Sequence, residues 1–171
     1  MKVKVLDGRH TYDGSQIKPL WAHSLGIRES SVVAFRGSMD VGDILDLEDV
    51  HTEIKGDDLV HFIVERFANP ATMWGAYLMQ RLLVLVLCEY LTDLGVRSVR
   101  KGDDVYVNGG KLTVCIASAS LSSEKVHCGV NITTRGVPRG VRASCLSEVI
   151  DGWRDDMWKE FARAVGGAFA H

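Results

Sequence analysis

Apolar and polar residues alternate in several short segments of this chain, which is the pattern of half-buried β-strands. The strongest turn signal is Asn108-Gly109, which lies between two alternating runs and predicts a β-hairpin. We expect this hairpin to extend over Asp103–Ser118 and to bring Asp103 and Asp104 close to Lys111. The predicted strands are Lys2–Leu6, Ser31–Phe35, Leu59–Phe67, Val96–Val99, Val105–Val107, Lys111–Ala119 and Lys125–Ile132.

The segments between the first strands have the composition of turns and caps. Asp13 or Ser15 is a suitable cap for a short helix that runs through Trp21 and His23. The acidic stretch Asp40–Val50 is interrupted, which predicts a loop with a short strand or turn. Gly56-Asp57-Asp58 predicts a turn that introduces the next strand.

The longest apolar stretch predicts a helix from Asn69-Pro70, with Asn as the cap, to about Asp93, before Gly95. It is apolar on most faces, which predicts the central helix of the core. The charged residues within it favour a buried helix over a membrane span.

A second helix is predicted to begin near Ser147 or Asp151 and to end at Gly166-Gly167. Its buried stripe recurs every four residues and consists of Trp153, Met157, Phe161 and Val165. The order of elements predicts one α+β domain over residues 1–171, with a largely antiparallel sheet and helices packed on one face.

The composition supports one globular domain and limits the classes of molecule that the protein is expected to bind. The 171 residues are 46% hydrophobic and 25% charged, with a net charge of −2. This balance argues against nucleic acid or a membrane surface as a partner. The four cysteines form no Cys-x-x-Cys pair, which predicts reduced, packed thiols and no metal site. No signal peptide is recognised, so we expect a cytoplasmic protein.

Several polar residues on the predicted strands are candidates for a ligand site. Arg36-Gly37 ends a strand and can bring a charge and the backbone close to an anion, or can form an ordinary turn. His61 and Glu65 share a strand face as a base and its orienting partner, or as a hydrogen-bonded polar spot on a half-buried sheet. His127 and Asn131 also share a face, and we expect them to converge with Lys111 on a ligand pocket.

The hairpin resembles a motif of the biotin and lipoate ligase superfamily. In biotin protein ligases this motif reads Lys-Trp-Pro-Asn-Asp, followed by Gly-x-Lys-x-x-Gly-x-Leu. Asp103-Asp104 stand where the motif has Asn-Asp, and Lys111 stands on its lysine. Val130-Asn131-Ile132-Thr133 is similar to a later Leu-Asn-Val-Asn strand. The resemblance implies that Lys111 contacts the acyl substrate and its adenylate.

Most of the chain is also similar to an uncharacterised archaeal family in this superfamily. The segments that carry this second resemblance are Tyr12–Ile17, Val33–Gly37, His61–Glu65, Gly102-Asp103-Asp104, Lys111-Leu112 and His127–Ile132. It implies the fold shared by biotin and lipoate ligases and class II aminoacyl-tRNA synthetases, an antiparallel sheet flanked by helices.

The chain departs from the ligases where they carry an arginine- and glycine-rich loop that wraps the adenylate phosphate. Here the stretch is Glu53–Asp58, with one glycine and several acids. A third hypothesis, an assembly or tRNA-related partner protein from the synthetase side of the superfamily, is disfavoured by the near-neutral charge. Two main hypotheses therefore remain. One is an acyl-ligase or acyltransferase acting on a lipoate-, octanoate- or biotin-like acid, or on its adenylate or thioester. The other is a non-catalytic small-molecule binding or regulatory protein that kept the fold.

The resemblance also implies roles and partners. Lys111 and Asp104 would be catalytic, with ATP and Mg²⁺ as the cofactors if a nucleotide binds. The expected partners are the small acid or acyl-adenylate, an acyl-carrier or lipoyl-type acceptor protein, and a second copy of the chain in a homodimer. The residues expected to bind the ligand are Arg36, Gly37, His61, Asp103, Ser118, His127 and Asn131.

Overall fold

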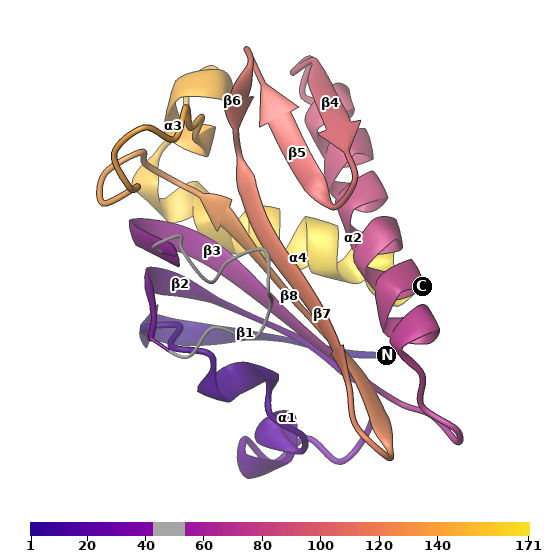
Figure 1. Cartoon of the computed structure of the whole chain (residues 1–171). Coiled ribbons are helices and arrows are strands. Elements are labelled where there is room, and N and C mark those ends of the chain that lie inside the picture. The colour runs from indigo at the N-terminus through magenta and orange to yellow at the C-terminus, as the bar shows by residue number, and fades with distance from the viewer. Residues whose placement is uncertain (43–53) are drawn as a thin grey trace.

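The computed structural model describes residues 1–42 and 54–171 and contains a large and a small β-sheet (Figure 1). The large sheet has the strand order β1-β2-β3-β8-β7; β1 and β2 are parallel and the other neighbours are antiparallel. The small sheet has the order β4-β5-β6 and is antiparallel. The strands are β1 (Lys2–Arg9), β2 (Ser31–Val41), β3 (Ile54–Phe67), β4 (Ser98–Lys101), β5 (Asp104–Val107), β6 (Gly110–Lys111), β7 (Thr113–Ala119) and β8 (Ser123–Asn131).

The central strands β2 and β3 are longer than the alternation of the sequence predicts. Arg36-Gly37 does not end β2, and Gly56-Asp57-Asp58 lies within β3, so both turn predictions were wrong. The two strands remain paired on both sides of these glycines, and a neighbouring group packs closely at each of them. A Cβ atom on Gly37 would lie 1.8 Å from the carbonyl oxygen of His10. The predicted loop Asp40–Val50 begins inside β2 and otherwise lies outside the described residues.

The long helix α2 (Met73–Asp93) begins later than expected and ends as expected. Its N-cap is Thr72, whose Oγ1 accepts a hydrogen bond from the Gly75 amide at 2.9 Å. Asn69-Pro70 precedes the helix as a cis peptide, so the predicted Asn cap was wrong. Residues 70–72 remain outside the helix because the Glu124 carboxylate accepts a hydrogen bond from the Thr72 amide and the Thr72 hydroxyl accepts one from the Gly75 amide.

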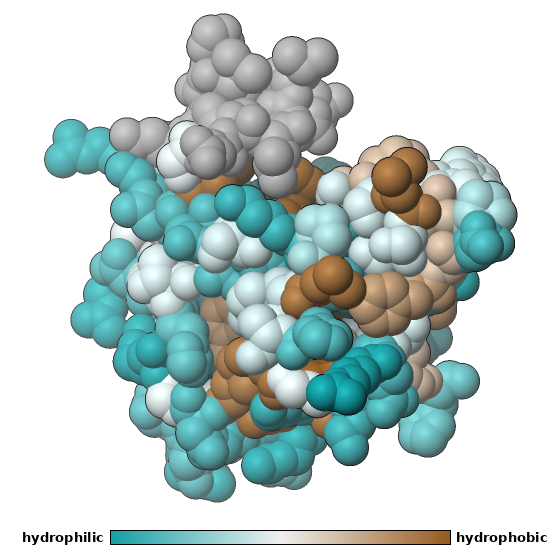
Figure 2. Space-filling model, turned by 90° about the horizontal axis from the view of Figure 1, so that it is seen from below, coloured by the Kyte–Doolittle hydropathy of each residue, from teal (hydrophilic) through white to brown (hydrophobic). Residues whose placement is uncertain are grey.

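α2 contributes one face to the main core and leaves the other face exposed, so the predicted central core helix is only partly buried. It packs on β7 and β8, while α4 (Trp158–Ala170) covers β1 and β2 on the same side of the large sheet (Figure 1). By length and composition α2 is the one described helix that could span a membrane, but half of that stretch is buried in the protein, as in a core helix. Its exposed apolar side chains are Met73, Trp74, Tyr77, Leu78, Leu82 and Leu85. Seen from below, the surface is mostly hydrophilic with separate hydrophobic patches (Figure 2).

The C-terminal segment consists of α3 (Leu146–Val149), η3 (Asp155–Met157) and α4. Phe161 and Val165 are buried in the core, as predicted. Trp153 and Met157 precede α4, and the helix continues through Gly166-Gly167 to Ala170, so both predicted ends of this helix were wrong. Gly166 lies on the buried face of α4, where a Cβ atom would make only ordinary contacts of 3.4 and 3.5 Å with Val3 and Val32, so this glycine does not end the helix.

The opposite side of the large sheet is covered by η1 (Ser15–Ile17) and α1 (Trp21–Ser24). A second apolar cluster lies under them and includes Tyr12, Phe35 and Ile63. Helical segments therefore cover both faces, which corrects the expectation of one covered face. Burial on both faces also explains why the central strands are apolar at consecutive positions.

Candidate functional site

The hairpin around Asn108-Gly109 forms, and it ends earlier than predicted. β5 pairs with β6, and both turn residues have a positive φ, 52° at Asn108 and 76° at Gly109, as a type I′ turn requires. After Lys111 the chain leaves the small sheet, and β7 joins the large sheet. The expected hairpin Asp103–Ser118 is therefore two elements, and Lys111 lies where the two sheets meet.

Lys111 is held by Asp104 on the neighbouring strand. Its Nζ lies 2.9 Å from Asp104 Oδ2, and the two side chains are 33% and 20% exposed. Burial disfavours the ammonium, but the hydrogen bond and charge of Asp104 outweigh it and raise the pKa of Lys111. Burial likewise raises the pKa of Asp104, and Lys111 offsets this only in part. The site therefore holds a charged ammonium at neutral pH.

The backbone of Lys111 is clamped between β8 and residues 142–144. Asn131 Nδ2 donates to the carbonyl oxygens of Lys111 at 3.3 Å and Ser144 at 3.1 Å. The Lys111 amide donates to the Arg142 carbonyl at 2.8 Å, and the Ser144 amide donates to the Lys111 carbonyl at 2.9 Å. Lys111 is thus fixed on a rigid element, which suits a positioning role.

A cavity of about 100 Å³ lies beside Lys111. Its walls are largely apolar and are formed by Met39, Ile54, Lys55, Lys111, Thr113, Val114, Asn131, Val137, Pro138, Val141 and Ala143. The fixed ammonium of Lys111, with Lys55 also in the lining, can neutralise a carboxylate or an acyl oxygen, while the apolar walls contact the beginning of an apolar tail. Lys111 and Asn131 line this cavity together, and Asp104 lies behind Lys111.

His61 and His127 form a separate buried pair. His61 Nδ1 lies 3.0 Å from His127 Nε2, and His61 Nε2 lies 3.3 Å from the Gly37 carbonyl oxygen. The ring of Tyr12 stacks on His127 with centroids 3.5 Å apart. Burial lowers the pKa of His61 to about 4 and lowers that of His127 well below its usual range, so both rings are neutral at pH 7. Neither histidine is among the residues that line the Lys111 cavity.

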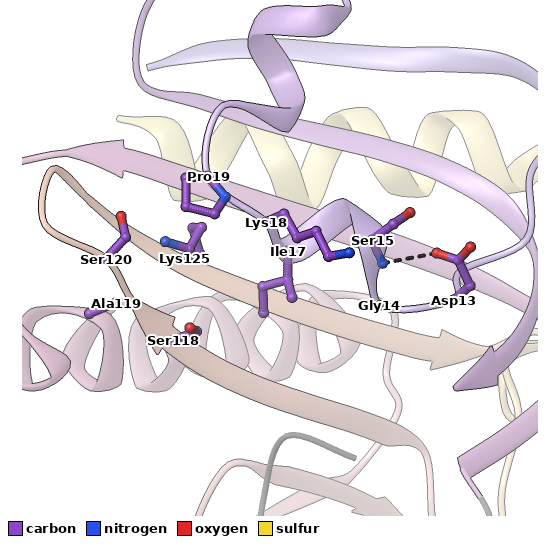
Figure 3. A pocket seen from close by; sticks show the side chains of 10 residues that line it. All are labelled: Asp13, Gly14, Ser15, Ile17, Lys18, Pro19, Ser118, Ala119, Ser120 and Lys125. Atoms are coloured by element: carbon purple, nitrogen blue, oxygen red, sulfur yellow. Dashed lines mark hydrogen bonds between the residues drawn. The ribbon is translucent and has the colours of Figure 1, made fainter. Parts of the chain in front are cut away.

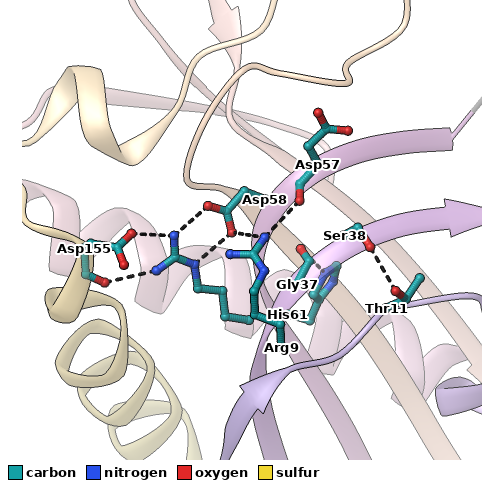
Figure 4. Close-up of polar contacts among 9 residues, drawn as sticks. Arg9, Thr11, Gly37, Ser38, Asp57, Asp58, His61 and Asp155 are labelled. Carbon is teal, nitrogen blue, oxygen red and sulfur yellow. Dashed lines mark hydrogen bonds and ion pairs between the residues drawn. The ribbon is translucent and has the colours of Figure 1, made fainter.

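Arg36 belongs to an ion-pair cluster with Asp58, Asp155 and Arg9, and Figure 4 labels these three partners. Its Nε and Nη2 donate to the two carboxylate oxygens of Asp58 at 2.8 and 2.6 Å. Nη2 also lies 2.6 Å from Asp155 Oδ1, and Arg9 lies 3.0 Å from Asp58. These partners raise the pKa of Arg36 despite its burial. The cluster ties β2 and β3 to the segment before α4.

The remaining candidate residues, Asp103 and Ser118, do not line the Lys111 cavity. Asp103 Oδ2 accepts a hydrogen bond from Gln80 on α2 at 3.0 Å, and Asp103 Oδ1 lies 3.5 Å from Arg81. Asp103 and Asp104 therefore have separate partners. Within residues 1–42 and 54–171, no group of three or more His, Cys, Asp or Glu side chains is placed to hold a metal ion. Ser118 lines a different cavity, which the alternation of β7 alone does not reveal.

The fold is that of biotin and lipoate protein ligase catalytic domains. The chain superposes on the lipoate protein ligase of a bipartite lipoylation system from Thermoplasma acidophilum with a TM-score of 0.65 and 12% identity, covering 99% of this chain and 83% of that one. On a mutant of the Aquifex aeolicus biotin protein ligase in complex with biotin, the TM-score is 0.57 and the identity 17%, and the match covers 99% of this chain and 69% of that one. At these identities the likeness concerns the fold alone.

The chain belongs to the family described as Domain of unknown function (DUF366), whose model matches residues 1–171. A similar solved structure, a protein of unknown function from Pyrococcus horikoshi, has a TM-score of 0.90 and 40% identity over 99% of this chain and 92% of that one. The uncharacterized protein MJ0805 from Methanocaldococcus jannaschii is 37% identical over 145 residues, which is 80% of this chain and 65% of that protein. The chain thus matches slightly less than two thirds of that relative's length.

Proposed function

We propose that this protein binds a small carboxylic acid with an apolar tail, or its acyl derivative, and acts on it as an acyl-ligase or acyltransferase. The observation that carries the proposal is Lys111, a fixed ammonium at the edge of an apolar cavity. The acyl head group would lie against Lys111 and the tail against Val114 and Met39. Lipoate, octanoate and biotin are the model acids, because the fold is that of ligases for such acids.

In the reacting complex, Lys111 would stabilise negative charge on the acyl oxygen or on the phosphate of an adenylate. Asp104 keeps the ammonium charged and oriented. Asn131 and Ser144 fix the backbone that carries it. An acyl group would pass to a carrier or lipoyl-type acceptor protein, and ATP with Mg²⁺ would be needed only for a ligase.

Binding without catalysis is the second candidate, and the stretch 54–58 favours it. In this chain the stretch is the start of β3, where Asp58 is already bound by Arg36 and Arg9. A strand whose carboxylate is bound by two arginines does not offer the backbone donors of a glycine-rich phosphate loop.

Calorimetry with octanoate, lipoate and biotin tests the binding step. Wild type should bind at least one of them, and Lys111→Met should weaken that binding by about tenfold or more, which corresponds to ~1.4 kcal/mol. Lys101→Met is the matched control, because Lys101 lies on β4 of the same small sheet and does not line the cavity. No binding of any acid, or equal binding by Lys111→Met, would overturn the site.

Pyrophosphate release then separates the two candidates. Acid-dependent release of pyrophosphate from ATP–Mg²⁺ by wild type, lost in Lys111→Met, supports a ligase. Transfer from an acyl-thioester to a carrier protein without ATP supports an acyltransferase. Tight binding of the acid with neither reaction supports a binding protein.

A further inference from the structure

A second, larger cavity lies at the other end of the β7–β8 pair. It has a volume of about 420 Å³, within the range of small-molecule sites. Figure 3 shows that its lining comes from the segment around η1 and from the β7–β8 end of the large sheet. The residues that line it are Asp13, Gly14, Ser15, Ile17, Lys18, Pro19, Ser118, Ala119, Ser120 and Lys125. Neither Lys111 nor Asn131 is among them.

Lys125 is the feature of this cavity that needs explanation. The residue is only 2% exposed, and burial lowers the pKa of its ammonium. Its Nζ donates at 3.2 Å to the carbonyl oxygen of Ser123 and at 3.4 Å to the Ser123 hydroxyl, both two residues away on its own strand. An ammonium has three donors, so these long bonds leave donor capacity for a partner in the cavity.

The nearest acid does not pair with Lys125 directly. Glu65 lies opposite Lys125 in the β3–β8 register, and its charge partly supports the ammonium. However, Glu65 Oε1 already accepts hydrogen bonds from the Leu20 amide at 2.9 Å and the Ser123 hydroxyl at 2.8 Å. No ion pair of Lys125 is found within residues 1–42 and 54–171. The described protein therefore buries an ammonium without a direct counter-ion.

The other polar groups of the lining suit an anion. Ser118 lies directly opposite Lys125 in the β7–β8 register, and Lys18 adds a second ammonium from the η1 side. The one carboxylate of the lining, Asp13, accepts a hydrogen bond from the Ser15 amide at 2.9 Å. Figure 3 shows Asp13 at the end of the lining away from Lys125. Hydroxyls and ammonium groups gathered around a cavity are the groups that bind carboxylate or phosphate oxygens.

We propose that the Lys125 cavity binds a small organic anion, with its carboxylate or phosphate group on Lys125 and Ser118 and with Lys18 closing the site. The anion supplies the counter-charge that Lys125 lacks. This site is independent of the function proposed for Lys111, because the two cavities share no lining residue.

Titration of the ¹⁵N-labelled full chain with succinate and with inorganic phosphate tests the proposal, with sodium chloride added to keep the ionic strength constant. The wild type should show saturable NMR shifts at residues 13–19 and 118–125. Lys125→Gln should raise Kd by about tenfold or more, and Lys18→Met should raise it to a smaller extent. The preferred probe of the two identifies the anion as a carboxylate or a phosphate.

Two controls keep the result decisive. Lys101→Met, whose side chain lines neither cavity, should bind succinate or phosphate as the wild type does. Saturable shifts confined to the residues around Lys111 would place the anion in the other cavity and overturn the proposal. If Lys125→Gln fails to fold, lysine side-chain NMR of the wild type decides, because bound anion should raise the pKa of Lys125. Absence of saturable shifts with both probes, or an unchanged Lys125 pKa, would equally overturn it.

Discussion

The Nζ of Lys111 lies 2.9 Å from Oδ2 of Asp104, across the β5–β6 hairpin and beside an apolar cavity. The pair is partly buried, so the charge of each residue depends on the other. Burial by itself would lower the pKa of the ammonium, and the carboxylate reverses that effect. The charge of Lys111 in the proposed acyl site therefore depends on Asp104 of the neighbouring strand β5.

Asp104→Asn is expected to lower the pKa of Lys111, because it removes the hydrogen bond to a charged acceptor and leaves the burial. A pH titration of the lysine side chains by NMR measures this directly. Asp103→Asn is the matched control: Asp103 affects Lys111 only through its more distant charge, so its loss should lower the pKa less. An equal effect of both variants would show that the direct contact is unimportant.

Gly75→Ala is expected to destabilise the protein by about 1–3 kcal/mol, although alanine normally favours a helix. A Cβ at this position would lie 2.0 Å from Oε1 of Glu124, which is buried and bound to Thr72 and Arg66. Urea unfolding measures the change. Gly167→Ala in α4 has open space around it and should stabilise by ~0.5–1 kcal/mol. If both variants stabilise the protein, the packing described at Gly75 is wrong.

The buried histidine pair predicts a loss of stability in mild acid. A folded-state pKa of about 4 for His61 lies below its unfolded value of about 6.5, so the unfolded chain binds protons first as the pH falls. The stabilising contribution is complete above pH ~6.5 and is lost as the pH falls towards ~4, on the order of 1–3 kcal/mol.

Urea unfolding at a series of pH values between these limits checks this histidine effect. His127→Asn should reduce the slope of stability against pH, because burial holds the pKa of His127 down as well. The slope should remain in His23→Asn, whose side chain is exposed. A wild-type slope near zero between about pH 5 and 6.5, where histidines of the unfolded chain titrate, would contradict the neutral pair.

The Arg36 cluster predicts graded effects of its two carboxylates. Asp58→Asn should destabilise by about 3 kcal/mol, because it removes the buried carboxylate that accepts from both Nε and Nη2 of a buried guanidinium. Asp155→Asn should cost about 1 kcal/mol or less, since the Asp155 side chain is 85% exposed. Thermal unfolding compares the two with Asp156→Asn, an exposed carboxylate paired with Arg154. The reverse order would contradict the burial of the Arg36–Asp58 pair.

Local patterns in the sequence predicted much of the fold. The α+β class, the antiparallel sheet and the Asn108-Gly109 turn follow from alternation and from a dipeptide that accepts positive φ at both positions. The end of α2 before Gly95 follows from a residue that adopts the left-handed conformation. The predictions failed at Gly37 and Gly56, where a neighbouring group packs closely, and at Gly166, which lies within α4; none of these glycines marks the end of an element.

The site was harder to predict, because its residues come from distant parts of the chain. The motif resemblance pointed to Lys111, and the predicted proximity of Asp104 to it is confirmed; the structure adds an apolar cavity beside the pair. No local sequence pattern predicts that Tyr12 stacks on His127 or that the Lys125 ammonium is buried without a direct counter-ion. The former depends on the backbone bridge between Tyr12 and Met39 of β2, and the latter on Ser123, whose hydroxyl is bound to both Glu65 and Lys125.

By itself, the sequence determined the elements, the family-like motif and the position of Lys111 at the end of a hairpin, because periodicity and turn chemistry act between near neighbours. Only the tertiary structure decided that the chain leaves the small sheet after Lys111 and so places that ammonium between two sheets. It also decided that His61 and His127 pair under Tyr12 while Ser118 and Lys125 line a second cavity. These arrangements depend on strand order and on which face each helix covers, and burial then sets the charges of the residues enclosed.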